Sequence, residues 1–235
     1  MALDEPRLHE LIEESQDIHS DAMRATHTTL DEVVEDGRAA RAGRSADLDD
    51  ARRGFITKAL FAAGAVGAGF GTNFLRNSFS RVFAAGNDVA ALQTSAAIEN
   101  LAIAVYTKAA SLPPNISGAA NPVVLKFVQT TIQQHGDHAN AFNAAIANLG
   151  GTKQTGIDQT VYNAVVSPAL PRITGPADVL SLAITLEDAA AQTYVAFASQ
   201  ANDAHALKTW ASIAPIEAQH VAVLSAVRAL LVGGA

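Results

Sequence analysis

Glutamate is rare in the second part of this chain, and where it occurs it interrupts apolar helical patterns. After Ala85 the sequence contains three glutamates, Glu99, Glu187 and Glu217. Each lies near the middle of a stretch whose apolar residues recur at helical spacing, on the stripe that should face a core. An ionised carboxylate buried alone is very costly, so it must be protonated, paired or bound to a metal. Because this part of the chain has few basic residues and none on those stripes, salt bridges explain the glutamates poorly.

Four stretches after Ala85 have helical character, and their ends are marked by helix-breaking residues. The first ends before Pro113-Pro114, the second ends at Gly150-Gly151, and Asn202 or Asp203 is a natural cap for the fourth. The expected helices are residues 88–110, 122–149, 176–200 and 203–231. Short turns predict two antiparallel hairpins, and the long link over residues 150–175 is what a bundle with one crossover needs. The sequence therefore predicts an all-α four-helix bundle over residues 86–235.

The two predicted hairpins repeat one pattern of polar residues. The first helix of each carries a Glu followed by a Tyr two turns later, and the second carries two ligand residues at i and i+3, on one face. These residues are Glu99, Tyr106, His135 and His138 in the first hairpin and Glu187, Tyr194, Glu217 and His220 in the second. Such a pseudo-twofold repeat lets each hairpin supply half of a dinuclear site. Without metal, the carboxylates would have to hydrogen-bond each other or stay protonated.

This pattern resembles the ferritin-like superfamily, which includes bacterioferritins, rubrerythrins and manganese catalases. Proteins of that fold place one Glu on each of two helices and Glu-x-x-His on the other two. The resemblance implies that Glu99 and Glu187 are the single carboxylates, and that Glu217 with His220 is one Glu-x-x-His motif. It also implies that His138 is the histidine of the other motif. Tyr106 and Tyr194 resemble tyrosines that some members place beside the metals, which marks them as candidate catalytic residues, with ordinary core residues as the alternative.

His135 departs from the family pattern, because the family usually has a bridging glutamate at this position. A neutral imidazole cannot bridge two metals as a carboxylate does. Three arrangements stay open: His135 is a terminal ligand of an asymmetric site, solvent replaces the carboxylate bridge, or only one metal binds tightly. A core histidine that supports the site is a further alternative. Gln134 and Asp137 project in other directions around the helix and are poor substitutes.

Residues 1–50 form an acidic extension with sparse apolar positions such as Leu8, Leu11 and Ile12 at near-helical spacing. One or two amphipathic helices are expected here, in a segment too polar to build its own core. Two interpretations stay open. The segment is a solvated and partly disordered leader, or it is a docking helix for a partner.

Residues 51–85 have the layout of an export signal. The order Arg52-Arg53-Gly54-Phe55-Ile56-Thr57-Lys58, a Gly/Ala-rich run and the small residues Ala84-Ala85 resemble a twin-arginine signal. The segment predicts a periplasmic, cell-envelope or extracellular protein, with cleavage after Ala84 or Ala85. An uncleaved form would contact the membrane through residues 51–85, and a buried core helix could imitate the same pattern.

The composition narrows the chemistry. Cysteine is absent, which excludes disulfides and thiolate sites. The net charge of −7 argues against nucleic acid as a partner. Carboxylate and imidazole ligands suit two ions of iron or manganese, with zinc possible, and the expected activity is ferroxidase, peroxidase or oxidase chemistry with dioxygen or hydrogen peroxide. The alternative is a non-catalytic, stress-related or structural envelope protein, or a subunit that assembles with its own copies or another partner through residues 1–50.

Overall fold

The computed structural model describes residues 5–118 apart from 28–87, and residues 121–232. The described residues form helices and contain no strand. The long helices are α1 (Glu5–His27), α5 (Asp88–Ala110), α7 (Pro122–Asn148), α10 (Pro176–Gln200) and α11 (Ala204–Val232). The predicted all-α bundle is therefore confirmed. The segment predicted to be an export signal, residues 51–85, lies outside the described residues, and the three-part division of the chain stays a prediction.

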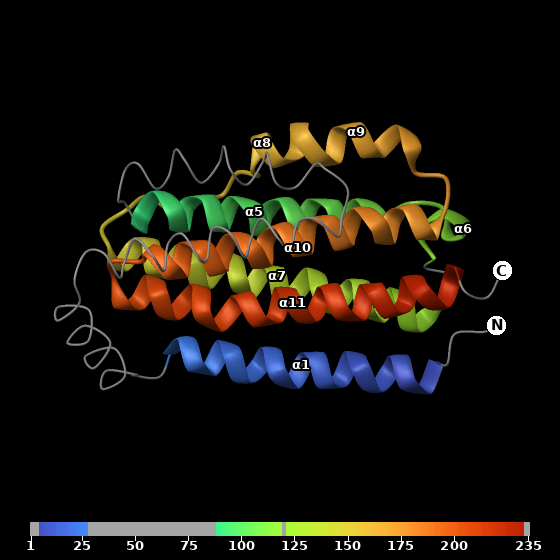
Figure 1. Cartoon of the computed structure of the whole chain (residues 1–235), viewed down its shortest axis with the longest axis horizontal. Coiled ribbons are helices and arrows are strands. Elements are labelled where there is room, and N and C mark those ends of the chain that lie inside the picture. The colour runs from blue at the N-terminus through green and yellow to red at the C-terminus, as the bar shows by residue number, and fades with distance from the viewer. Residues whose placement is uncertain (1–4, 28–87, 119–120, 233–235) are drawn as a thin grey trace, which may run out of the picture.

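The bundle is built from two antiparallel hairpins that pack side by side (Figure 1). Helix α5 pairs with α7, α10 pairs with α11, and the hairpins meet through α5 against α10 and α7 against α11. Helix α5 is long and apolar enough to meet the length and composition criteria of a membrane span. Half of that stretch is buried inside the structure, as expected for a core helix of a bundle.

Capping residues explain why the helix ends lie within one or two residues of the predicted positions. The Asn121 side chain accepts hydrogen bonds from the backbone N–H groups of Val123 and Val124, and Pro122 occupies the first helical turn of α7. The Asp203 side chain accepts from the N–H of Ala206 and caps α11. Gly150, which follows α7, has a φ of 74°, a conformation that favours glycine.

The link between the hairpins is more helical than its Gly, Pro and Thr content suggests. It contains α8 (Gln159–Val161), the π-helical turn η2 (Tyr162–Val166), α9 (Ser167–Ala169) and the 3-10 turn η3 (Leu170–Arg172). Val161 and Val166 are buried against Leu101 of α5 and Leu182 of α10. The crossover thus covers the outer face of the α5–α10 pair, as Figure 1 shows.

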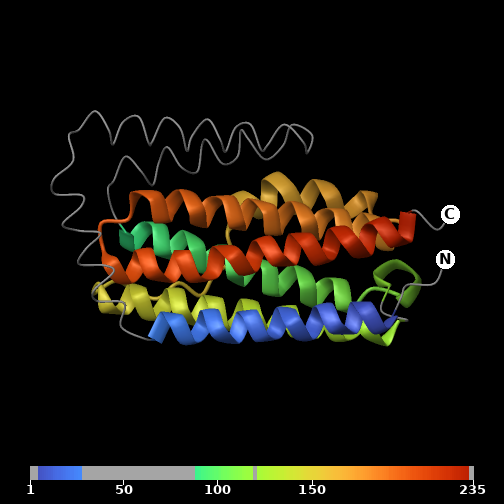
Figure 2. The ribbon, with the colours of Figure 1, turned by 60° about the horizontal axis from the view of Figure 1, so that its bottom comes forward.

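Helix α1 packs along α7 and α11 as a fifth long helix (Figure 2). Leu8 and Ile12 are buried in a cluster with residues of α7 and α11, and Ser15 and His19 are buried further along the same face. A few apolar residues suffice here because the bundle supplies the other side of the interface. Residues 5–27 thus form a helix that packs on the chain's own bundle, and a docking role toward another partner stays a prediction.

Candidate metal centre

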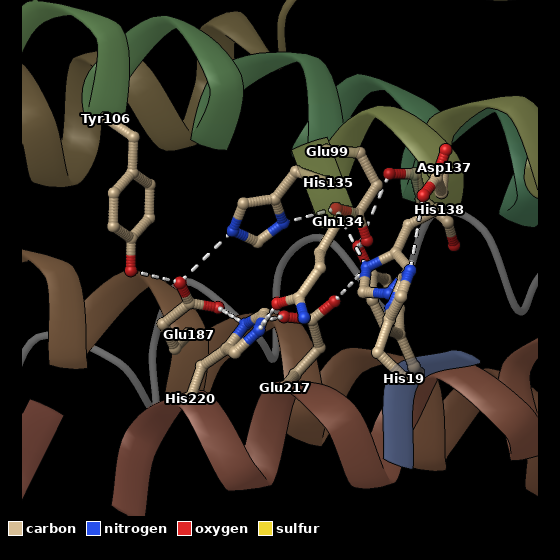
Figure 3. A network of polar contacts seen from close by, with 12 residues as sticks. His19, Glu99, Tyr106, Gln134, His135, Asp137, His138, Glu187, Glu217 and His220 are labelled. Carbon is tan, nitrogen blue, oxygen red and sulfur yellow. Dashed lines mark hydrogen bonds and ion pairs between the residues drawn. The ribbon is translucent and has the colours of Figure 1, made fainter. Parts of the chain in front are cut away.

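All six side chains predicted to bind metal meet in the middle of the bundle, between the two hairpins (Figure 3). Each is at most 2% exposed. They come from all four bundle helices: Glu99 from α5, His135 and His138 from α7, Glu187 from α10, and Glu217 and His220 from α11. The helical repeat in the sequence therefore converges on one buried cluster.

The six side chains form two overlapping groups of four. One contains Glu99 and His138, the other contains Glu187 and His220, and both contain His135 and Glu217. In each group the ligand atoms lie within 4.8 Å of one another, a separation that one ion between them could bridge. Each group thus has one carboxylate and one imidazole of its own. His135 and Glu217 occupy the two shared positions.

The two tyrosines connect the hairpins in a reciprocal way. The Tyr106 hydroxyl on α5 donates to Glu187 Oε1 on α10 at 2.5 Å. The Tyr194 hydroxyl on α10 donates to Glu99 Oε1 on α5 at 2.6 Å. Each tyrosine therefore holds the carboxylate of the other hairpin, which explains why the Glu and Tyr positions repeat together. Both are buried beside the carboxylates.

His135 lies between the two single carboxylates. Its Nδ1 is 2.7 Å from Glu99 Oε2, and its Nε2 is 3.2 Å from Glu187 Oε1. The imidazole thus contacts both carboxylates, at the position where the resemblance implied a bridging glutamate. This geometry fits a terminal ligand and also a core histidine that supports the site, so both alternatives stay open.

The contact between His138 and Glu217 is close without being a well-formed hydrogen bond. His138 Nδ1 lies 2.7 Å from Glu217 Oε1. Both atoms are nevertheless buried without a hydrogen-bond partner among the described residues, and so is His138 Nε2. Buried polar atoms are nearly always satisfied. Because these atoms belong to ligand-type side chains that face a shared space, the donor set fits metal ions.

Without metal, carboxylates and imidazoles of the site stabilise each other's charged forms. Burial raises the pKa of Glu99, but the imidazolium of His138 and the hydrogen bond from His135 outweigh it and bring the pKa to about 2. Burial lowers the pKa of His138, but Glu217 and Glu99 outweigh it and raise the pKa to about 9. Burial also lowers the pKa of His135, but the nearby charge of Glu187 outweighs it and raises this pKa well above its usual value. Protons on the imidazoles therefore compete with metal for this site.

Glu217 is the exception among the carboxylates. Burial and then the nearby charge of Glu99 raise its pKa, and the histidines only partly offset this. Of the three carboxylates, Glu217 at a shared position therefore has its ionised form stabilised least by the protonated histidines beside it. A metal ion would supply the missing positive charge.

The structure adds two residues that the sequence pattern did not select. Gln134 is buried, accepts a hydrogen bond from His220 Nε2 at 2.7 Å and donates to Gln16 of α1 at 2.9 Å. His19 of α1 is 2% exposed, its Nε2 donates to Asp137 at 3.2 Å, and its ring centroid lies 5.1 Å from that of His138. The α1 side of the site is therefore closed by polar side chains (Figure 3). A helix-facing pattern in α1 could have signalled this, because Leu8, Ile12, Ser15 and His19 follow a spacing of three to four residues.

A small cavity of about 20 Å³ lies on the opposite side, between α5 and α10. It is lined by Glu99, His135 and Glu187, and the crossover residue Val161 closes it from outside. This volume is about that of one water-sized probe. The cavity can hold a single small molecule next to three candidate ligands.

A family model described as a ferritin-like domain matches residues 87–230, which contain α5, α7, α10, all but the last two residues of α11, and all six candidate ligands. Searches of curated proteins and of solved structures found no match.

Proposed function

This chain belongs to the ferritin-like domain family, and on that premise we propose that it is an exported dimetal protein with redox activity toward dioxygen or hydrogen peroxide. The proposed ligands are Glu99, His135, His138, Glu187, Glu217 and His220. Iron or manganese suits this set of carboxylate and imidazole ligands best, with zinc as a third option. Iron or manganese, when bound, would supply one-electron chemistry with oxygen species, which zinc would not.

The observation that carries the proposal is the pair of overlapping four-residue groups, which share His135 and Glu217. Two cations held this way would lie next to each other in a buried, water-poor environment. Three carboxylates leave a net charge of about +1 with two divalent ions. The imidazole at the second shared position makes this centre less negative than one with four carboxylates, which favours ions in a low oxidation state.

The other residues have supporting roles in the proposal. Tyr106 and Tyr194 orient the two single carboxylates through their short hydrogen bonds. Burial, followed by the neighbouring carboxylates, moves the pKa of each hydroxyl well above its usual value, so both stay protonated donors. The small cavity beside Glu99 and Glu187 has room for about one water-sized molecule, so it is too small for an organic substrate.

We also propose that residues 51–85 direct export and that residues 5–27 remain on the mature protein. The packing of α1 over the candidate ligands supports retention, because removal of α1 would leave Gln134 and His138 facing solvent. Retention implies an uncleaved, membrane-tethered form. Peptide mapping of the protein from its native envelope tests this, since detection of residues 5–27 is expected and their absence would contradict it.

Elemental analysis of the full chain, purified with iron and manganese available, tests the metal centre. We expect about two equivalents per chain in the wild type and a loss of both in the Glu217→Ala/His220→Ala double variant, because Glu217 belongs to both groups. Asp188→Asn is the matched control, since Asp188 is exposed next to Glu187. One equivalent would mean that His135 makes the site asymmetric. No metal in a folded wild-type chain would refute the redox function and leave a structural or stress-related bundle, whose centre is held by the paired charges alone.

A further inference from the structure

A second and much larger cavity lies at one end of the bundle. Its volume is about 460 Å³, within the range of pockets that bind small organic molecules. Its walls come from the C-terminal half of α5, the N-terminal halves of α7 and α10, the last part of α11, the start of α1, and the crossover. In an antiparallel bundle these segments all meet at the same end, the end at which α6 lies in Figure 1.

The walls of this cavity are almost entirely hydrocarbon. Leucine, valine, isoleucine, alanine and phenylalanine side chains dominate the lining, with Tyr106, Ser117 and Tyr162 as its uncharged polar residues. The Tyr106 hydroxyl is already used by Glu187, and the Ser117 hydroxyl donates to a backbone carbonyl. Water inside would find few partners, whereas an alkyl chain would bury apolar surface on every side.

One charged side chain, Lys108, lines the cavity, and it is exposed. It lies in the last turn of α5. No ion pair to another described residue involves it. Leu170 of the crossover also lines the cavity and is 41% exposed, so the two residues lie where the cavity meets solvent. A hydrocarbon interior with one cation at its rim matches a molecule with one long apolar chain and one negative head.

The crossover supplies the outer wall through Tyr162, Val166 and Leu170. Tyr162 and Val166 are the two ends of the π-helical turn η2. Single π-helical turns are rare and are frequently found at functional sites. Here both ends of the turn line the cavity, so the crossover forms a wall of the cavity as well as linking the hairpins.

We propose that the cavity binds one molecule of a free long-chain carboxylic acid, with its carboxylate at Lys108 and its alkyl chain inside the bundle. This goes beyond the proposed metal chemistry and does not depend on it, because the lining and Lys108 are complete without metal. The two sites touch at Tyr106, which lines the cavity and also holds Glu187. The bound chain therefore contacts a residue that orients a candidate ligand.

Calorimetric titration of the metal-free full chain with dodecanoate, below its micelle concentration, tests the proposal. One molecule per chain is expected. Lys108→Gln should weaken dodecanoate binding about threefold, as expected for an exposed ion pair, and leave dodecanol binding unchanged. Lys126→Gln is the control, because Lys126 is exposed on α7 and does not line the cavity.

A second pair of variants tests the interior. Ala183 lines the cavity one helical turn before Glu187, so Ala183→Phe should fill part of it and weaken the binding of both ligands at least tenfold. Ala144→Phe adds the same side chain on the exposed face of α7 and should have no effect. Thermal unfolding checks that each variant is folded.

No binding by the wild type would overturn the proposal, and so would binding that neither Lys108→Gln nor Ala183→Phe changes. Binding to phosphatidylglycerol vesicles without binding to monomeric dodecanoate would also overturn it, because it would identify a membrane surface as the partner. A failure of the metal centre appears in elemental analysis instead, so the two proposals fail separately.

Discussion

The two hairpins of the bundle are alike in their first helices and different in their second. Tyr106 on α5 donates a hydrogen bond to Glu187 on α10, and Tyr194 on α10 donates one to Glu99 on α5. The two hydrogen bonds are of nearly equal length. On α7 and α11 the symmetry ends, because His135 stands opposite Glu217. The helices that supply unshared carboxylates are thus equivalent, while the helices that supply the shared positions are not.

This difference separates two kinds of position in the centre. Each tyrosine–glutamate pair depends on both hairpins, so altering one partner leaves a buried group unsatisfied. The shared positions face both groups of candidate ligands, and they hold an imidazole on α7 and a carboxylate on α11. The imidazole contacts Glu99 and Glu187 through its two nitrogens, so it links the hairpins even when no metal is present.

Making the shared positions alike should give the largest effect. His135→Glu adds a fourth carboxylate to a buried site and removes an imidazolium. We expect the free energy of unfolding of the metal-free chain to fall by about 3 kcal/mol, because a buried charge loses its partner. Added Mn²⁺ should restore more stability to the variant than to the wild type. Thermal unfolding with and without Mn²⁺ measures both effects.

The control for that substitution is His205→Glu, which changes the same residue types on the exposed face of α11. His205→Glu should change the melting temperature by no more than about one or two degrees, both with and without Mn²⁺. Equal stabilisation of His135→Glu and wild type by Mn²⁺ would mean that residue 135 does not face the metals.

Much of this fold could be predicted from the sequence because its signals are local. Asn121-Pro122 and Asp203 mark helix starts, and Pro113-Pro114 and Gly150-Gly151 follow helix ends. Glu99, Glu187 and Glu217 stand out because a carboxylate on an apolar stripe conflicts with burial, and a metal resolves the conflict. Local rules therefore account for four helices and six candidate ligands.

The parts that could not be predicted depend on contacts between distant segments. Gln134 acquires its role from Gln16, which lies 118 positions away, and from His220 on another helix. The packing of α1 against α7 and α11 could not be predicted either, because its few apolar residues do not specify which surface they contact. The large cavity results from residues on every long helix, each of which is an ordinary core residue in its own stretch.

The likeness of the first helices can be tested by removing one hydroxyl at a time. Tyr106→Phe and Tyr194→Phe should each lower the free energy of unfolding of the metal-free chain by about 2 kcal/mol, since each removes a hydrogen bond to a buried carboxylate. Denaturant unfolding measures the two values, with Tyr162→Phe in the crossover as control. A difference above about 1 kcal/mol would show that the pairs are not equivalent.

The pH dependence of metal binding should reveal the contribution of His138, on the second helix of the first hairpin. The folded pKa of His138 is about 9, against 6.5 for an ordinary histidine, so metal must displace its proton at neutral pH. Apparent Mn²⁺ affinity should rise about tenfold per pH unit for each proton released, from pH 6 to 8. Isothermal titration at three pH values measures the slope. His138→Ala should reduce it, and a flat wild-type profile would contradict the assignment.

The stability of the metal-free chain should depend on pH in the opposite direction. The raised pKa of His138 contributes stability below pH 6.5 that is lost as the pH rises through 9. The lowered pKa of Glu99 contributes stability above pH 4.5 that is lost as the pH falls through about 2. This pair therefore stabilises the metal-free bundle most between pH 4.5 and 6.5. Metal should shift the optimum upward, which thermal unfolding across this range can follow.

The smallest expected effect concerns the helix outside the repeat. Gln16 of α1 accepts from Gln134, and Gln134 in turn accepts from His220, so α1 supports a ligand of the second hairpin. Gln16→Ala should lower the free energy of unfolding by about 1 kcal/mol, the usual value of one hydrogen bond, without changing the metal content. Asp17→Ala is the control, because Asp17 is the exposed neighbour on the same helix. If both variants unfold alike, α1 does not hold Gln134, and the asymmetry of the centre rests on His135 and Glu217 alone.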